Sequence, residues 1–342
     1  MSLQSIKQNN KAILYAKRIW RSKDISFCKT LEKAASQYCD KEPSVDKKRL
    51  IAQMHRAYRK YALTPGEFED FKLFDKTDEA IKEYISREEL LRKFGNGKRN
   101  HFPKDKFQRY SIFSDCYHRD VILIEDSSEK NAAKYTSFLK NKSAFIAKPI
   151  RGAKGKGIEI ITKEAAPDIL TLQKCTEFPV MLEELIDQGK ELGYVHPQSV
   201  NTVRVVSAMT KQNKVVILYA LFRCGRDGSV VDNVGSGGMI MLVGMEDGKV
   251  CTDGLCAHVY YKEHPNTGVV FRDIVIPDWD RLLETARKAH GLLPKQALIG
   301  WDFAWTTTGW DLVEANPAPA FASWQTLSGK GIRPRLTELG VL

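Results

Sequence analysis

The pattern of apolar and polar positions divides the chain into a helical N-terminal part and a mixed α+β part. Up to about residue 110, apolar residues recur at helical spacing, as at Ile13, Ala16 and Ile19. Beyond that point most apolar residues gather in short runs that are typical of buried strands. The sequence therefore predicts an α+β protein with a helical N-terminal region.

The predicted elements follow this division. The N-terminal pattern predicts two or three helices within residues 5–62, helical segments at 68–74 and 78–94, a turn at 64–66 and a capping box at 86–89. The apolar runs predict strands at 121–124, 144–149, 158–161, 179–185, 202–210, 215–222, 238–243 and 257–260. Helices are predicted at 129–139 and 279–290, and two strands joined by a turn within 300–317.

Length and composition indicate a globular protein. The 342 residues are enough for two or three packed units, and 43% of them are apolar. No apolar run approaches the roughly 20 residues of a membrane-spanning helix, and residues 1–7 lack the apolar core of a signal peptide. The seven cysteines are scattered without metal-binding spacing, so we expect free thiols in a cytoplasmic protein.

The net charge of +11 comes from the N-terminal third. Residues 1–110 contain 26 Lys and Arg against 15 Asp and Glu, whereas the remainder contains 27 of each kind. Such an excess suits a solvated helical surface or an anionic partner, whether nucleic acid, a lipid surface or a phosphorylated substrate. Because the charges are dispersed and no DNA- or RNA-binding motif occurs, we expect a solvated surface and no nucleic-acid partner.

The strongest candidate chemistry lies in the two strands of residues 300–317. Glu314 and Asn316 are two positions apart and point to one face of a strand, and Asp302 can face the same side from the paired strand. Two carboxylates and an amide oxygen form a hard oxygen site that suits Mg²⁺ bound together with phosphates. The alternative is a solvent-exposed polar face, which the flanking apolar residues make less fitting.

A glycine-rich loop at residues 152–157 is the second candidate, because it carries Lys154 and Lys156 between two strands. Glycines let a backbone close on an anion, and the lysines supply positive charge. Lys148 lies within the preceding apolar strand, where its ammonium group needs an anion. A plain hairpin turn and a lysine that extends to solvent are the alternatives.

Three further polar residues lie among apolar strands. Arg204 stands in a β-branched strand, Arg223 closes the next one, and Asn233 lies in the glycine-rich turn at 231–238. Arginines beside a phosphate loop suggest contacts with phosphoryl oxygens. For each arginine taken singly, a buried ion pair is an equally good interpretation.

The order of these features resembles the ATP-grasp superfamily over about residues 110–328. The Glu-x-Asn-Pro sequence at 314–317 is the most diagnostic element, and Asn201 to Val205 and Gly300 to Asp302 look similar to the glutamate-ligase branch. The chain is most similar to the sugar-transfer-associated ATP-grasp group. The resemblance implies two α+β subdomains that clasp ATP, at residues 109–186 and 187–342, after a basic helical region at 1–108.

The resemblance also implies roles for the candidate residues. Lys148 would contact the adenine side and the α-phosphate, Lys154 and Lys156 would close over the β- and γ-phosphates, and Glu183, Glu184 and the backbone of Leu185 would bind the adenine amine edge and the ribose. Arg204, Arg223 and Asn233 would face the transferred phosphoryl group or the acceptor, and Asp302, Glu314 and Asn316 would hold Mg²⁺.

The implied reaction is an ADP-forming ligation of a small-molecule carboxylate to an amine through an acyl-phosphate, with ATP and Mg²⁺ as cofactors. A small-molecule kinase would share every ATP-binding residue and differ only in its acceptor. An ATP-binding module without activity need not retain all three metal residues. The chain departs from many ligases after the metal residues, since Pro317-Ala318-Pro319-Ala320 stands where those ligases have a Pro-Gly pair.

Overall fold

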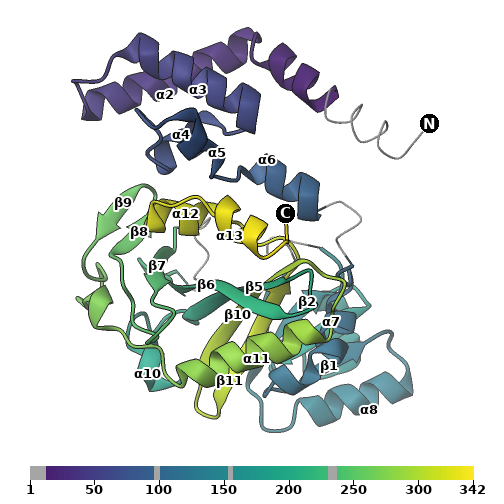
Figure 1. The fold of residues 1–342 in the computed structure, drawn as a ribbon. Helices are drawn as coiled ribbons and strands as arrows, with labels where there is room; N and C mark the ends of the chain where they lie inside the picture. The colour runs from purple at the N-terminus through teal and green to yellow at the C-terminus, as the bar shows by residue number, and fades with distance from the viewer. Residues whose placement is uncertain (1–12, 96–100, 153–156, 230–236) are drawn as a thin grey trace. The chain divides into compact units, whose positions relative to one another are not determined.

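The computed structural model describes residues 13–95, 101–152, 157–229 and 237–342 (Figure 1). Contacts divide the chain into two compact units, one of residues 1–100, 208–214 and 317–342 and the other of residues 101–207 and 215–316. The sequence placed one boundary between 108 and 109 and assigned the C-terminal residues to the α+β part. The contacts instead group residues 317–342 with the N-terminal helices.

The first unit is helical, as the sequence predicts. After a helix at residues 13–21 it contains α2 (Ile25–Lys41), α3 (Lys47–Tyr61), α4 (Pro65–Asp70), α5 (Asp78–Lys82), α6 (Arg87–Leu90), the π-helical turn η1 (Leu91–Gly95), α12 (Ala322–Ser328) and α13 (Arg333–Glu338). The apolar faces of α2, α3 and α4 meet in one core that includes Leu50, Met54 and Phe68. The helical spacing of α3 therefore predicts its buried side correctly. In the first helix, by contrast, Ile13 and Ala16 are exposed, so the spacing there does not mark a buried side.

Two local predictions in this unit are wrong. The predicted turn at 64–66 begins α4, because the Thr64 side chain accepts a hydrogen bond from the Glu67 backbone N–H and the Glu67 carboxylate accepts one from the Thr64 backbone N–H. The single helical segment predicted at 78–94 is interrupted after α5, because Ser86 caps a new helix by accepting from the Glu89 backbone N–H. The capping box predicted at 86–89 is thus present in its first half.

The second unit contains a small four-stranded sheet. Its strands are β1 (Val121–Ile124), β2 (Ala144–Pro149), β3 (Glu159–Thr162) and β4 (Val180–Glu184), and they lie in the order β1-β4-β2-β3. Its helices are α8 (Glu129–Phe138) and α9 (Ile169–Cys175). Buried residues of both helices and of all four strands form one core, which includes Tyr135, Phe145 and Leu182.

The same unit contains a larger, seven-stranded sheet in the order β11-β10-β5-β6-β7-β8-β9. Its strands are β5 (Thr202–Met209), β6 (Val215–Cys224), β7 (Met239–Val243), β8 (Gly254–Cys256), β9 (Val259–Tyr261), β10 (Leu298–Thr306) and β11 (Gly309–Asn316). The helices and helical turns of this unit outside the small sheet are α7 (Lys106–Ile112), η2 (Ser114–Cys116), α10 (Lys190–Gly193), η4 (Phe271–Asp273) and α11 (Trp279–Gly291). Figure 1 shows α11 along the large sheet, where it contacts β6.

The strand predicted at 257–260 begins two residues too early, because the observed strand β9 starts at Val259. Ala257 and His258 have positive φ angles of 46° and 69° and form the turn between β8 and β9. Positive φ is uncommon for residues with a side chain, so the apolar composition gave no signal for this turn.

All seven cysteines are free, which confirms the expected thiols. Among the helices in the described part of the chain, none is long and apolar enough to cross a membrane.

Candidate functional site

The hairpin of β10 and β11 places the three predicted metal-binding residues on adjoining positions. Asp302 lies directly opposite Glu314 in the antiparallel register, and Gly300 lies opposite Asn316. Residues opposite each other in such a pair project to the same face. The Asp302 side chain is buried, Asn316 is half-buried and Glu314 is exposed.

Two arginines from neighbouring strands bind Asp302. Arg204 on β5 donates from its Nε to Oδ1 and from its Nη2 to Oδ2, the latter at 2.5 Å, and Arg223 on β6 donates from Nη1 to Oδ1 at 3.1 Å. Burial by itself would raise the pKa of Asp302, but the two guanidinium groups outweigh it and hold that pKa below its ordinary value. Asp302 is therefore held as a carboxylate.

Glu314 and Asn316 have the chemistry of a Mg²⁺ site. Within the described residues neither side chain makes an ion pair or a hydrogen bond, so their oxygens are available on one strand face. Mg²⁺ is usually bound through one or two carboxylates together with substrate phosphates, and a full set of protein ligands is unnecessary. The described residues contain no cluster of three or more His, Cys, Asp or Glu that could hold a metal by themselves. The residues present fit Mg²⁺ bound with a nucleotide.

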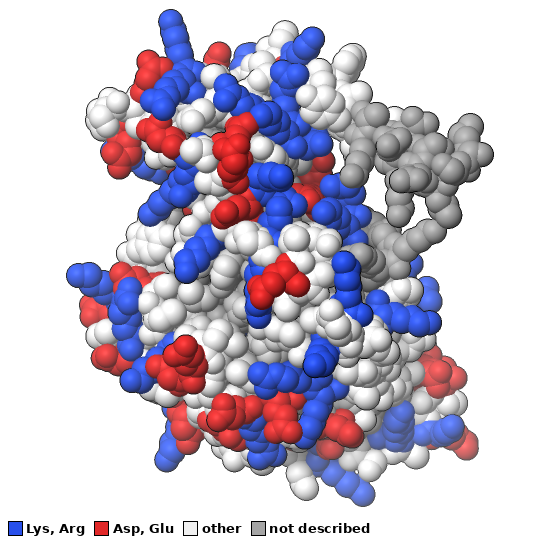
Figure 2. All heavy atoms as spheres, in the orientation of Figure 1, with Lys and Arg blue, Asp and Glu red and all other residues white. Residues whose placement is uncertain are grey.

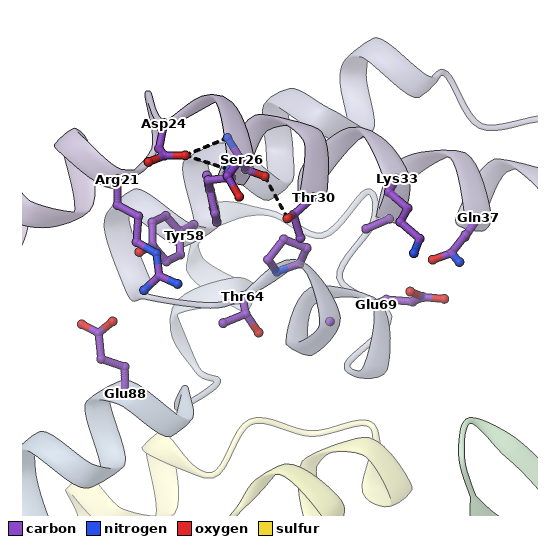
Figure 3. Close-up of a pocket in the computed structure, with 14 residues that line it drawn as sticks. Arg21, Asp24, Ser26, Thr30, Lys33, Gln37, Tyr58, Thr64, Glu69 and Glu88 are labelled. Atoms are coloured by element: carbon purple, nitrogen blue, oxygen red, sulfur yellow. Dashed lines mark hydrogen bonds between the residues drawn. The ribbon is translucent and has the colours of Figure 1, made fainter.

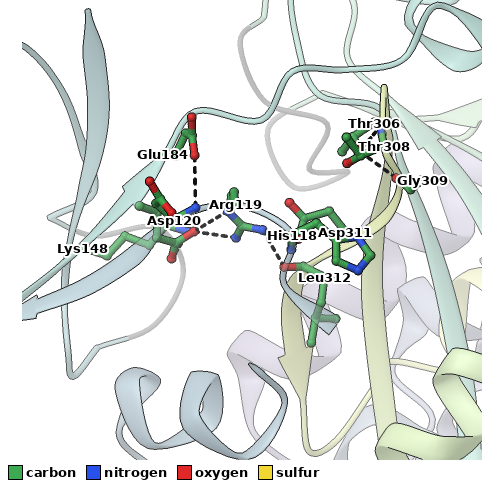
Figure 4. A network of polar contacts seen from close by, with 11 residues as sticks. His118, Arg119, Asp120, Lys148, Glu184, Thr306, Thr308, Gly309, Asp311 and Leu312 are labelled. Atoms are coloured by element: carbon green, nitrogen blue, oxygen red, sulfur yellow. Dashed lines mark hydrogen bonds and ion pairs between the residues drawn. The ribbon is translucent and has the colours of Figure 1, made fainter. Parts of the chain in front are cut away.

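A buried polar network joins the small sheet to β11 (Figure 4). Arg119, just before β1, donates from Nη2 to Glu183 Oε2 at 2.6 Å and from Nη1 to Asp311 Oδ1 at 2.7 Å and to the Leu312 carbonyl at 2.9 Å. The Nζ of Lys148, near the end of β2, lies 2.8 Å from Glu183 Oε1. Lys148 and Arg119 thus occupy both oxygens of Glu183.

These contacts keep Glu183 ionised and engage both oxygens of its carboxylate. Its side chain is only 1% exposed, and although burial would raise its pKa, Lys148 and Arg119 hold that pKa below the ordinary value. The sequence assigned Glu183 to the adenine edge and ribose, whereas the structure engages it as the anion that Lys148 and Arg119 share. A lysine inside an apolar strand needs such a partner.

Glu184 and Leu185 follow Glu183 at the end of β4. Glu184 is half-buried, and its Oε2 accepts a hydrogen bond from the Asp120 backbone N–H at 3.1 Å. Leu185 follows the last residue of β4, and its backbone makes no hydrogen bond within the described residues. An unpaired backbone N–H and C=O at a strand end can bind an adenine amine edge.

Sequence reasoning missed Lys106 and Arg109, which lie at the start of α7 and on its following turn. The Lys106 Nζ donates to the Pro149 carbonyl at 2.7 Å. Burial lowers the pKa of Lys106; Glu314 opposes this shift by attraction and Lys148 adds to it by repulsion. Lys106 therefore lies within electrostatic reach of both Lys148 and Glu314. The signal was weak, because Lys106 stands among several other basic residues in the sequence.

Arg119 and Asp311 were also missed as site residues. Arg119 lies just before β1, and Asp311 lies between Trp310 and Leu312 in β11. A charged residue next to a buried strand is the signal that could have identified both. The remaining predicted residues, Lys154, Lys156 and Asn233, lie outside the described residues.

Comparison with known proteins identifies the family. The family described as sugar-transfer associated ATP-grasp matches residues 86–340. No curated protein matches the chain. Among solved structures the chain is similar in fold to VanG D-Ala:D-Ser ligase from Enterococcus faecalis, with 14% identity, a TM-score of 0.44 and coverage of 69% of this chain and 61% of that one.

Two other solved structures match with comparable sequence identity and TM-score. D-alanyl-alanine synthetase A from Vibrio cholerae is 15% identical with a TM-score of 0.38, and the match covers 69% of this chain and 58% of that one. N5-carboxyaminoimidazole ribonucleotide synthetase from Thermotoga maritima is 12% identical with a TM-score of 0.37, over 66% of this chain and 44% of that one. The chain spans less than two thirds of the length of each of these three proteins. Because the family match covers more than half of the chain and includes both sheets, the protein belongs to the sugar-transfer associated ATP-grasp family and has an α+β ATP-grasp fold with a helical N-terminal region.

Proposed function

We propose that this protein is an ATP- and Mg²⁺-dependent ligase that joins a carboxylate to an amine through an acyl-phosphate. The observation that carries the proposal is the set of charges around Asp302, where Arg204 and Arg223 meet the face that bears Glu314. A carboxylate acceptor needs cations before phosphorylation and hydrogen-bond donors for its oxygens afterwards. Metal-ligand oxygens and two guanidinium groups on one sheet meet both needs.

On the nucleotide side we assign the phosphates to lysines. Lys148 and Lys106 are held by Glu183 and by the Pro149 carbonyl respectively, so both ammonium groups are fixed before a nucleotide arrives. Fixed cations stabilise developing charge at little reorganisation cost. Lys154 and Lys156 would complete the phosphate contacts, and Glu184 and the Leu185 backbone would bind the adenine and ribose.

On the metal side, Glu314 and Asn316 would hold Mg²⁺, with Asp302 as a further oxygen ligand. When bound, Mg²⁺ neutralises charge on the phosphate oxygens and orients the transferred group. Arg204 and Arg223 orient Asp302 through three hydrogen bonds. The two arginines would then contact the acceptor carboxylate or the phosphoryl group, with Asn233 beside them.

The second candidate is a small-molecule kinase that phosphorylates a hydroxyl group. Such an enzyme usually needs a carboxylate that serves as a general base beside the acceptor. Asp232, the residue that could serve, lies outside the described residues. Two guanidinium groups against the single Asp302 carboxylate leave a net positive charge, which supports an anionic acceptor. A role in polysaccharide or amino-acid-conjugate biosynthesis and a cytoplasmic location are part of our proposal.

Trapping the activated carboxylate tests the proposal. Purified protein is incubated with ATP, Mg²⁺, hydroxylamine and pooled candidate carboxylates, and ADP, phosphate and hydroxamate are measured. A ligase releases ADP and phosphate in equal amounts and forms a hydroxamate. If phosphate stays attached to a hydroxyl-bearing product and no hydroxamate forms, the kinase assignment is correct and the ligase proposal is wrong.

A further inference from the structure

The helical unit contains a pocket that the proposed ligase chemistry does not use. Its volume is about 360 Å³, within the roughly 300–1,000 Å³ of small-molecule sites. Five cations line it, from the helix at 13–21, the end of α3, α5, η1 and α13: Arg18, Lys60, Lys82, Arg92 and Arg333. Figure 2 shows Lys and Arg side chains gathered over the N-terminal helices on the face in view, with Asp and Glu among them.

Two of the cations are already neutralised. Arg333 donates from Nη1 to Glu89 Oε1 at 3.0 Å and from Nη2 to Oε2 at 2.6 Å, and Lys60 forms an ion pair with Asp78. Burial would raise the pKa of Glu89, but Arg333 and Lys93 outweigh it, so Glu89 is a paired carboxylate. These pairs leave the pocket with three other cations and one other acid.

The remaining charges favour an anion. Lys82 and Arg92 are exposed, and neither makes an ion pair with a carboxylate in the described parts of the chain. The one other acid of the pocket, Glu88, is exposed and likewise unpaired among these residues. Three cations therefore face one carboxylate, and like charges held this close attract a counter-ion.

Arg18 gives an independent indication. It is half-buried, and its Nε is fully buried without a hydrogen-bond partner in the described residues. Its Nη1 makes one long contact, 3.5 Å to the Lys60 carbonyl, and its guanidinium lies 6.0 Å from the centre of the Tyr15 ring. A buried donor without a partner is unfavourable, and an anion in the pocket could accept from the guanidinium group.

A neighbouring pocket shows that this charge excess is not general in the helical unit. That pocket is larger, about 610 Å³, and its charged residues carry both signs (Figure 3). Its Asp24 accepts hydrogen bonds from the first turn of α2, and its Glu69 pairs with Lys41. Arg21 and Lys33 face these acids and Glu88, so the larger pocket has no excess of positive charge.

We propose that the smaller pocket binds a phosphorylated small molecule through Arg18, Lys82 and Arg92. Guanidinium groups match phosphate oxygens in pairs, and a phosphate ester carries the multiple charges that three cations can neutralise. Tyr15 and Tyr61 line the same pocket and offer aromatic surface to the organic part of the ligand. The proposal does not depend on the ligase assignment, because the pocket lies entirely within the helical unit.

Pyrophosphate is the probe. Calorimetric titration of the full chain without Mg²⁺, at constant ionic strength, should show binding that the double variant Lys82→Gln/Arg92→Gln weakens by about tenfold or more. Both side chains are exposed, so this variant keeps its fold, which its circular dichroism and thermal midpoint check.

Two control variants locate the binding. Lys47→Gln/Lys48→Gln removes the same charge from exposed positions of the same unit outside the pocket and should change affinity less than twofold. Lys148→Met, on the proposed nucleotide side, should leave this binding intact. The proposal is overturned if wild-type protein does not bind pyrophosphate, if both double variants weaken binding equally, or if only Lys148→Met abolishes it.

Discussion

At the scale of single residues, a substitution of Glu314 tests the metal site without disturbing the fold. It is exposed on β11, opposite Asp302, and makes no ion pair within the described residues. We expect Glu314→Gln to reduce Mg²⁺-dependent ADP formation by at least about a hundredfold, since an amide is a poor substitute for a carboxylate ligand. The thermal midpoint should stay within a few degrees of wild type.

The matched control for this change is Glu284→Gln. Glu284 is an exposed residue on α11 that pairs with Lys288, so the substitution removes the same charge away from the site. Turnover should be unaffected there. Unchanged ADP formation in Glu314→Gln would remove Glu314 from the metal site and weaken the ligase proposal with it.

His290 lies in a buried chain of hydrogen bonds behind the large sheet. The Trp301 Nε1–H donates to Ser207 Oγ at 2.8 Å, Ser207 Oγ lies 2.7 Å from His290 Nδ1, and His290 Nε2 lies 2.9 Å from the Gln296 carbonyl. The Gln296 carbonyl accepts a hydrogen bond from Nε2, and the Ser207 hydroxyl donates to Nδ1 in preference to its longer contact of 3.4 Å with the Ile299 carbonyl, which assigns the neutral ring with its proton on Nε2. Burial lowers the pKa of His290 to about 4, with the Gln296 carbonyl opposing the shift.

The buried imidazole should make stability depend on pH. In the unfolded chain His290 binds a proton below about pH 6.5, whereas in the folded chain it does so only near pH 4. The free energy of unfolding therefore falls as the pH drops through this window, and the histidine contributes nothing above it. Between pH 7.5 and 5 we expect wild type to lose about 2 kcal/mol more than His290→Gln, which keeps one donor and one acceptor.

Urea titrations of both proteins at the two pH values measure this difference. Other titrating groups are common to wild type and variant, so they cancel in the comparison. Equal losses in the two proteins would mean that His290 takes up a proton in the folded chain and that the assigned tautomer is wrong.

At the scale of elements, Arg119 joins the small sheet to β11. It is buried between Glu183 and Asp311, and each acid is itself buried. Burial alone would lower the pKa of Arg119, but the two carboxylates outweigh it and raise that pKa. Removing one member of a buried ion network leaves an uncompensated charge, at a cost of about 3–5 kcal/mol.

Arg119→Met should therefore destabilise the α+β unit by about that amount. Arg119→Met/Asp311→Asn should recover part of the loss, because it also removes the charge that Arg119 no longer neutralises. Denaturant unfolding of both variants measures the two free energies. If the double variant is instead less stable than Arg119→Met by as much as Asp311→Asn alone destabilises the wild type, the two residues act independently.

The extent to which the sequence predicted the elements follows from the range of the interactions involved. β1 and β2 were predicted at their observed bounds, because apolar runs and local turn residues define them. The interruption after α5 and the turn at Ala257 and His258 were not, since the first depends partly on Gln325 and the second on positive φ angles. The capping box at 86–89 is a local signal for the first, whereas no local pattern marks the second.

The candidate site shows the same limit. Spacing alone placed Glu314 and Asn316 on one face. The arginines were also identified, but their common partner was not, since Asp302 lies 98 residues from Arg204 and 79 from Arg223. Glu183 is a similar case, because only the pairing of β2 with β4 brings Lys148 onto it.

At the scale of the whole molecule, the C-terminal segment is part of the helical unit. Gln325 on α12 is fully buried, and its Oε1 accepts hydrogen bonds from the Ile85 backbone N–H at 2.9 Å and the Ile332 backbone N–H at 3.2 Å. Its Nε2 donates to the Ile85 carbonyl at 3.0 Å. One side chain thus satisfies three backbone groups in two segments far apart in the sequence.

Gln325→Leu should destabilise the helical unit and leave the α+β unit unchanged. The substitution keeps the side chain nearly the same size but leaves three buried backbone groups unpaired, at about 1–3 kcal/mol each before relaxation. Hydrogen exchange should accelerate in α4, α5 and α6, while β10 and β11 keep their protection. Gln37→Leu makes the same chemical change at an exposed position of α2 and should alter neither unit. Faster exchange in both units would show that they unfold together, and unchanged exchange in both would show that Gln325 does not hold the C-terminal segment in place.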